Sequence, residues 1–261
     1  MEVIICQDAG EAGRRAARRI AAVLSRTDEP VLGVATGSTP LPTYRALAEL
    51  VDAGDLDTSR VTAFALDEYV GMPVDDERSY ADTIRRTVTE PLGLDPASVH
   101  VPDGMAENLV AGCQAYEDAI REAGGVDVQI LGIGGNGHIG FNEPTSSFAS
   151  RTRLKTLAPR TRQDNKRYFA EGERVPTHCV TQGLGTIMDA RHVLLLANGE
   201  KKAEAVAAAV EGPVSSMCPA SVLQHHPHAV VILDEAAASR LRLADYYRYI
   251  WDNKPEEYLE F

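Results

Sequence analysis

The sequence predicts an α/β fold, in which helices cover both faces of a mostly parallel central sheet (an α/β/α sandwich). Short apolar runs recur along the chain, and most are continuous rather than alternating, as expected for strands that are buried on both faces. Segments with helical periodicity separate these runs, and strands that alternate with helices form parallel βαβ units. The predicted strands are Val3–Cys6, Val31–Ala35, Thr62–Leu66, Val128–Ile133, His192–Ala197 and Ala229–Leu233.

The helices are predicted from capping residues and from apolar spacing. After the first strand, Asp8 and Glu11 form a capping-box pattern, and the apolar residues that follow line one helix face. After the second strand, Thr39 is expected to cap the next helix, with Pro40 in its first turn. Two further helices are predicted at Gly199–Glu211 and Glu235–Tyr249.

The stretch from Phe141 to about Pro176 is polar and basic and contains no clear strand. Long segments of this kind in a compact domain often cover a binding site, so we expect an active-site lid around residues 157–177. No repeat or flexible linker divides the sequence, and residues 1–261 are therefore expected to form a single domain. The residues after Pro255 are expected to be a tail.

The charge balance excludes some classes of partner. The chain has 26 Lys and Arg against 38 Asp and Glu, a net charge of −12. A protein that binds duplex nucleic acid or an anionic membrane needs a positive surface, so we expect neither partner. A small anionic ligand remains compatible with this charge, because a few cations and backbone N–H groups can form a local positive pocket.

Four cysteines are scattered along the sequence without a C-x-x-C pair, so we expect neither a disulfide framework nor a zinc site. The N-terminus lacks the basic and apolar regions of a signal peptide. The longest uncharged stretch, residues 213–233, is interrupted by prolines and histidines and cannot span a bilayer. We therefore expect a soluble cytoplasmic protein.

Ligands of open α/β sheets bind beyond the carboxyl ends of the strands. The first such end carries Thr36, Gly37, Ser38 and Thr39 before a predicted helix. Free N–H groups at the helix N-terminus and these hydroxyls predict an anion pocket suited to phosphate. It is not a Walker A loop, because no Gly-Lys-Ser/Thr follows. An ordinary capped turn is the alternative.

The second strand end carries adjacent carboxylates, Asp67 and Glu68, followed by Tyr69 and Gly71. A single acidic residue at this position is usually a helix cap. Two of them favour an acid/base site, because neighbouring carboxylates can push their pKa values apart.

The third strand end, Gly132–Pro144, is rich in glycine and contains a formal G-x-G-x-x-G. The dinucleotide-binding fingerprint needs a helix after the third glycine, and no helical periodicity follows here. The glycines instead allow backbone N–H groups to approach a ligand closely. His138 could then act as a titratable base with Glu143 as the carboxylate that holds it, and a structural histidine is the alternative.

Basic residues elsewhere could complete a phosphate clamp. Arg167 lies in the predicted lid, and Lys201 or Lys202 follows the fifth predicted strand. Solvated surface charges are the alternative for each. The His225-His226-Pro227-His228 segment suggests a metal site, but adjacent histidines point in different directions and no partner cluster has ligand spacing. We interpret it as a polar turn.

Taken together, these motifs resemble the glucosamine-6-phosphate deaminase family. The resemblance covers nearly the whole chain, and the order and spacing of the motifs make it specific. The matching segments are residues 35–40, 66–71, 132–144, 150–156, 183–190 and 219–224. It implies a modified Rossmann-like α/β/α sandwich. It also implies conversion of glucosamine 6-phosphate and water to fructose 6-phosphate and ammonia, with no metal or other cofactor.

The resemblance also implies residue roles. His138 moves a proton between O1 and O5 to open the sugar ring, and Glu143 and Asn136 hold its imidazole. Asp67 takes the C2 proton and returns it at C1. The residues expected to bind the phosphate are Thr36, Gly37, Ser38, Thr39, Arg167 and Lys202. Many family members have aspartate where this chain has Asn136, and an amide cannot stabilise an imidazolium by charge. We therefore expect an altered pH dependence.

Allosteric members of the family bind N-acetylglucosamine 6-phosphate between subunits. The corresponding residues here are Met1, Ser146, Arg153 and Lys155. The resemblance thus implies a homo-oligomer, with a hexamer as one form. Two alternatives stay open. One is a 6-phosphogluconolactonase or pentose-phosphate isomerase on the same fold, which Asn142-Glu143-Pro144 disfavours. The other is a non-catalytic sugar-phosphate sensor, which would not need a base at C2.

Overall fold

The central sheet has seven strands, all parallel, in the order β1-β10-β9-β6-β2-β3-β5. The fold is described from a computed structural model, which covers residues 1–255. The strands are β1 (Glu2–Cys6), β2 (Val31–Val34), β3 (Thr62–Ala65), β5 (Val99–His100), β6 (Val128–Gly132), β9 (His192–Ala197) and β10 (Ala229–Asp234). The predicted fold class and all six predicted strands are confirmed. The two-residue edge strand β5 was too short to give a signal.

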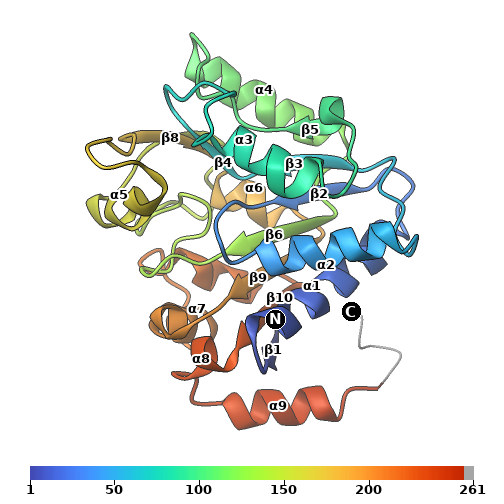
Figure 1. The fold of residues 1–261 in the computed structure, drawn as a ribbon. Helices are drawn as coiled ribbons and strands as arrows, with labels where there is room; N and C mark the ends of the chain where they lie inside the picture. The colour runs from blue at the N-terminus through green and yellow to red at the C-terminus, as the bar shows by residue number, and fades with distance from the viewer. Residues whose placement is uncertain (256–261) are drawn as a thin grey trace.

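Helices cover the sheet on both faces. The helices of residues 1–255 are α1 (Ala9–Leu24), α2 (Leu41–Asp52), α3 (Tyr80–Ile84), α4 (Leu109–Glu122), α5 (Pro159–Asn165), α6 (Leu184–Met188), α7 (Ala203–Val210), α8 (Glu235–Ala238) and α9 (Ala244–Asp252), of which α5 belongs to the predicted lid. Short 3-10 or π turns, η1 to η5, cover Arg85–Thr89, Pro96–Ser98, Lys166–Tyr168, Glu200–Lys202 and Pro219–His225. In Figure 1, α1 and α2 pack side by side in front of the sheet and α6 lies behind it.

The core explains the continuous apolar runs. Every residue of β2 is buried, and Ile4, Leu32, Val128 and Ile232 have no exposed surface. Such strands need apolar side chains on both faces, because a helix layer covers each face. Within residues 1–255, no helix is long and apolar enough to cross a membrane.

The helices were predicted in the right places, but their extents differ. The helix predicted at Gly199–Glu211 begins as the 3-10 turn η4, and α7 covers only Ala203–Val210. Asp8 caps α1 as predicted, with its Oδ1 accepting from the Glu11 N–H at 2.8 Å. Thr39 does not cap α2, because the helix begins one residue later than expected and has no side-chain cap. The helix predicted at 235–249 is divided into α8 and α9. The reason is Glu211, whose carboxylate accepts the backbone N–H groups of Arg242 and Leu243, both at 2.9 Å.

A second, antiparallel sheet was not predicted. It has the order β4-β8-β7, with β4 at Asp67–Tyr69, β8 at His178–Thr181 and β7 at Arg153–Thr156. The expectation of no strand between Phe141 and Pro176 was therefore wrong. The strand β7 was not predicted because its inward positions are the half-buried Arg153 and Lys155, so its sequence has no apolar pattern. Only one residue separates β3 from β4, so the small sheet begins directly at a carboxyl end of the large one.

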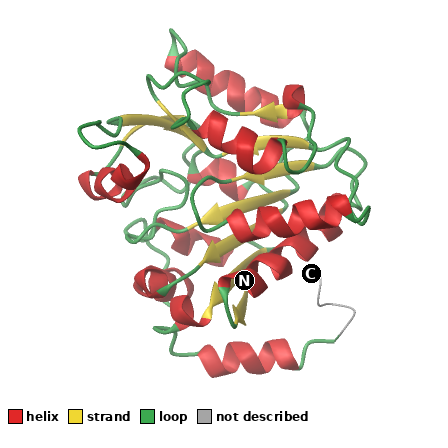
Figure 2. Cartoon of the chain, in the orientation of Figure 1, coloured by secondary structure: helices red, strands yellow, loops and turns green. Residues whose placement is uncertain are grey.

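The strand order changes direction between β2 and β6. These strands are neighbours, but the chain continues from β2 to β3 on one side and from β6 to β9 on the other. Loops that diverge in this way mark the usual ligand site of open α/β sheets. In Figures 1 and 2, the arrowheads of β6 and β9 point toward the side of the molecule that carries α5.

Candidate active site

A buried tyrosine, Tyr44, holds the start of the loop after β2 by two hydrogen bonds to its backbone. The hydroxyl of Tyr44 accepts from the Ala35 N–H at 2.9 Å and donates to the Ala35 carbonyl at 2.8 Å. Gly37 has a φ of +96°, which favours glycine, and it turns the chain toward the start of α2. Ser38 is exposed and Thr36 and Thr39 are half-buried, so their hydroxyls are accessible beside the helix N-terminus.

Asp67 is buried, and no donor or cation of the described residues compensates for the loss of water around its carboxylate. The residue is 6% exposed, and among residues 1–255 its carboxylate has no hydrogen bond or ion pair. Burial, with a smaller effect from the neighbouring charge of Glu68, raises its pKa to about 8. The His138 loop lies close by, since a Cβ placed on Gly140 would be 3.6 Å from Oδ2 of Asp67. The position thus suits a carboxyl group that exchanges a proton near neutral pH.

Glu68 has a structural role. Its carboxylate accepts the backbone N–H groups of Tyr69, Tyr80 and Ala81 at 2.7, 3.1 and 2.8 Å. The last two open α3, so Glu68 ties the start of that helix to the strand that carries Asp67. The phenol of Tyr80 in turn interacts with both Asp67 and the hydroxyl of Thr36. Tyr80 is therefore close to both the predicted base and the predicted phosphate loop, and its hydroxyl donates to that of Tyr69 at 3.1 Å.

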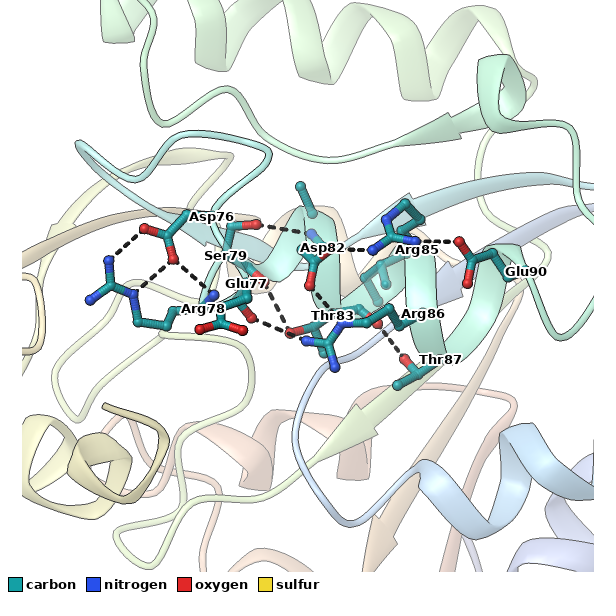
Figure 3. Close-up of polar contacts among 12 residues, drawn as sticks. Asp76, Glu77, Arg78, Ser79, Asp82, Thr83, Arg85, Arg86, Thr87 and Glu90 are labelled. Carbon is teal, nitrogen blue, oxygen red and sulfur yellow. Dashed lines mark hydrogen bonds and ion pairs between the residues drawn. The ribbon is translucent and has the colours of Figure 1, made fainter. Parts of the chain in front are cut away.

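Ion pairs hold α3 and the turn after it. Figure 3 shows Asp82 between Arg85 and Arg86, with distances of 2.5 and 2.6 Å. In the same view Arg78 faces Asp76. Arg78 forms a second ion pair with Glu173, which the figure does not draw, at 2.5 Å. The second pair joins the segment before α3 to the predicted lid.

The glycine-rich loop after β6 presents His138. A Cβ on Gly134 would lie 2.2 Å from the imidazole, so only glycine allows this packing. Nδ1 of His138 is 3.5 Å from Oε2 of Glu143, which is an ion-pair distance when the imidazole is protonated but is too long for a good hydrogen bond. The structure thus brings His138 and Glu143 together as predicted.

Glu143 is surrounded by donors. Its carboxylate accepts from Nδ2 of Asn136 at 2.6 Å, from Oγ1 of Thr161 at 2.5 Å and from the N–H of Ala158 at 3.4 Å. Burial by itself would raise the pKa of Glu143, but the nearby imidazole of His138 and the hydrogen bonds from Thr161 and Asn136 lower it to about 2. Glu143 is therefore ionised throughout the physiological range.

Asn136 differs from its expected role. Its side chain accepts from the backbone N–H of His138 at 3.3 Å and donates to Glu143, so it acts on the imidazole ring through Glu143. An amide fits here because it offers a donor, whereas an aspartate would place a second anion against Glu143.

Lys202 lies at the predicted phosphate end. Its Nζ donates to the carbonyl of Ile133 at 2.7 Å. Burial lowers its pKa, the charge of Asp164 opposes this, and the charges of Arg167 and Arg160 lower it further. Arg167, predicted from the lid, and Arg160, which sequence reasoning missed, are thus near Lys202.

The predicted lid contains α5 and the turn after it, and it contacts the site at several points. Thr161 reaches Glu143, and Nδ2 of Asn165 donates to the hydroxyl of Tyr69 at 2.9 Å. Phe169 contacts the same tyrosine edge-to-face, with ring centroids 5.9 Å apart. Thr161 and Tyr80, like Arg160, were not singled out from the sequence, since their contacts depend on how distant segments pack.

The residues expected at an effector site do not meet within one chain. Arg153 and Lys155 share one side of β7, and Ser146 is buried with an unpaired hydroxyl. Met1 instead lines a separate cavity of about 450 Å³. That cavity is at the amino ends of the strands and also contacts Arg19, His192 and His228.

The histidine segment before β10 is used structurally. Nε2 of the buried His226 is 2.8 Å from the carbonyl of Ala190, and its Nδ1 accepts from the His228 N–H at 3.1 Å. Both ring nitrogens are thereby occupied. Across residues 1–255, no group of three or more His, Cys, Asp or Glu side chains is placed to hold a metal ion.

Comparison with known proteins agrees with this geometry. Residues 7–232 match the family model of glucosamine-6-phosphate isomerases/6-phosphogluconolactonase. The glucosamine-6-phosphate deaminase of Cutibacterium acnes is 70% identical over 249 residues, 95% of each chain. The chain belongs to the glucosamine-6-phosphate deaminase family. A deaminase from Arthrobacter sp. is 58% identical over 98% of each chain.

Solved structures place the same family on this fold. A monomeric glucosamine-6-phosphate deaminase superposes with a TM-score of 0.90 at 42% identity, over 92% of this chain and all of that one. A 6-phosphogluconolactonase from Trypanosoma cruzi gives a TM-score of 0.73 at 21% identity over 92% of this chain and 97% of its own. The lactonase shares the fold, whereas the deaminase family shares the sequence as well.

Proposed function

We propose that this chain deaminates glucosamine 6-phosphate, converting it with water to fructose 6-phosphate and ammonia. The observation that carries the proposal is the pairing of two unlike groups at one sheet edge. One is Asp67, whose pKa is raised to about 8, and the other is His138 beside the ionised Glu143. The deaminases at 70% and 58% identity support the same activity.

Binding begins at the phosphate. The N-terminus of α2 with Ser38 and Thr39 offers N–H and hydroxyl donors, and Lys202 and Arg167 add positive charge. This end fixes the sugar, so that its reacting carbons extend toward Asp67 and His138. Positioning of this kind converts a slow encounter into an intramolecular proton transfer.

Proton transfers follow in two stages. His138 takes the proton of the O1 hydroxyl and gives it to O5, which opens the ring and leaves an aldehyde at C1. Asp67 removes the C2 proton while a proton of the 2-ammonium group passes to O1, which gives an enolamine. Asp67 returns its proton to C1, water adds to the iminium carbon C2, and ammonia leaves.

Glu143 and Asp67 have different roles in these proton transfers because they differ in charge. Glu143, held ionised by its donors, stabilises the imidazolium that forms during ring opening. Asp67 is buried, and burial makes its carboxylate a stronger base than it would be in water. Ammonia release from glucosamine, galactosamine and N-acetylglucosamine 6-phosphates tests the proposal. We expect turnover of the first, and turnover of none would overturn it.

We further propose that the chain forms a homo-oligomer with an effector site for N-acetylglucosamine 6-phosphate at a subunit interface. The paired cations of Arg153 and Lys155 and the unpaired hydroxyl of Ser146 support it, with Met1 supplied by a neighbouring subunit. A sigmoidal rate curve that becomes hyperbolic with this ligand is expected, and a curve insensitive to it would contradict the proposal.

A further inference from the structure

One cation of the lid has no assigned role. Arg160, in the first turn of α5, extends over the glycine-rich loop, and its Nη2 is 3.1 Å from where a Cβ of Gly135 would be. The guanidinium therefore lies against the loop backbone at Gly135. The loop is the one that follows β6 at the change in strand direction.

Lys202 meets the same loop two residues earlier, where its ammonium donates to the carbonyl of Ile133 at 2.7 Å. Arg160 and Arg167 are both close enough to Lys202 for their charges to act on it, while the carboxylate of Asp164 acts in the opposite sense. Three cations from η4 and the predicted lid thus gather where the carboxyl ends of β6 and β9 lie side by side.

Arg160 is also available for a ligand. Two residues further on, Arg162 donates from Nε and Nη2 to the carbonyl of Val175 at 3.2 and 2.9 Å, and so serves the lid itself. Arg160 is exposed and forms no hydrogen bond or ion pair within residues 1–255. A guanidinium held against a backbone but left unpaired offers its full set of N–H donors to an anion.

We propose that Arg160 is a third cationic contact of the substrate phosphate, and that through it the lid distinguishes phosphorylated from unphosphorylated sugars. The proposal rests on the proposed function. A guanidinium binds phosphate with two parallel N–H···O bonds, which a lysine cannot imitate. Because Arg160 belongs to α5, its bond to phosphate also secures the segment that brings Thr161 to Glu143.

The test is Arg160→Gln, with Arg160→Lys as the variant that keeps the charge. For glucosamine 6-phosphate we expect KM to rise about tenfold with kcat within about twofold, the effect of one charge-assisted contact. The dissociation constant of inorganic phosphate, measured by calorimetry, should rise by about the same factor, with Arg160→Lys in between. Any turnover of unphosphorylated glucosamine should be the same in Arg160→Gln and in the wild type.

Arg174→Gln is the matched control, because it removes the same charge from an exposed position of the same segment. Equal effects of Arg160→Gln and Arg174→Gln would overturn the proposal, since they would reflect general electrostatics. Unchanged phosphate affinity in Arg160→Gln would also overturn it. The phosphate measurement does not depend on turnover. If the wild-type chain released no ammonia while Arg160→Gln still weakened phosphate binding, the proposed function would fail and this inference would stand.

Discussion

Two carboxyl groups of the site, those of Asp67 and Glu143, are equally buried, but their pKa values are shifted in opposite directions. Asp67 is 6% exposed and Glu143 is 7% exposed. Asp67 has no hydrogen-bond donor among residues 1–255, and its pKa is raised to about 8. Glu143 has donors on both oxygens, and its pKa is lowered to about 2. Burial alone therefore does not decide whether a carboxyl group is charged, because the donors that face it do.

The difference between the two pKa values indicates which chemical role each carboxyl group has. A group that titrates near the working pH can take a proton from carbon and give it back, which is what isomerisation requires. A group that stays ionised cannot, but it can hold a positive imidazole in place. Pairs of acids whose environments push their pKa values apart are a recurrent feature of acid/base enzymes. Substitutions of these two residues and of their hydrogen-bond donors test this contrast.

The largest effect is expected for Asp67→Asn. Loss of the base should reduce ammonia release by roughly 10³- to 10⁴-fold while inorganic phosphate still binds. The variant should also be more stable than the wild type. Because the pKa rises from 3.8 to about 8 on folding, ionisation of Asp67 costs stability progressively between those pH values. The stability gain should therefore grow from pH 4 to pH 8, measured by urea unfolding, and level off above.

The exposed Asp28 provides the control, since Asp28→Asn changes the same group on the surface. It should alter neither activity nor the pH dependence of stability. Near-normal ammonia release from Asp67→Asn would remove Asp67 from the mechanism.

Glu143→Gln should behave in the opposite way in stability. The pKa of Glu143 falls from 4.5 to about 2 on folding, so its contribution is present above pH 4.5 and is lost as the pH falls toward 2. We expect a loss of up to about 3 kcal/mol at pH 7, at ~1.4 kcal/mol per pKa unit. Activity should fall about 100-fold because the imidazolium loses its counter-charge. Equal stability of variant and wild type at pH 7 would contradict the contrast.

The sequence located the two carboxylates because both follow buried strands. The apolar runs of the large sheet predicted where its strands end, and the strand-end rule then selected Asp67, His138 and Glu143. The small sheet was missed, since β4 and β7 are three and four residues long and carry charges. Short polar strands have no periodicity for a pattern to detect.

The partners that set the pKa values could not be found in this way. Thr161 is 18 positions from Glu143 and lies in a seven-residue polar helix. Arg160, beside it, lies against Gly135 of the same loop that carries Glu143. Neither the spacing nor the composition of α5 distinguishes these residues from solvated ones. Only the packing of α5 on the strand-end loops shows which of its side chains point inward.

Thr161→Val should have an intermediate effect. It keeps the shape of the side chain and removes one donor from Glu143, which raises the pKa of that carboxyl group toward its ordinary value. We expect kcat to fall about 5- to 10-fold, the cost of one hydrogen bond to a charged group. The acidic limb of the rate profile should move to higher pH. Thr161→Ser should restore both, and an unchanged profile in Thr161→Val would show that the hydroxyl only fills space.

The smallest effect is expected for Asn136→Asp, which is nearly isosteric. The new carboxylate would face Glu143, whose Oε2 is now 2.6 Å from Nδ2 of Asn136. Repulsion between the two anions raises the pKa of one of them, so the acidic limb of kcat/KM should move to higher pH, with a rate change of only a few-fold at pH 7. Asn136→Ala removes the donor without adding charge, and so separates the effect of the lost donor from the effect of the added charge. An Asn136→Asp profile that matched the wild type would show that the identity of residue 136 does not tune this site.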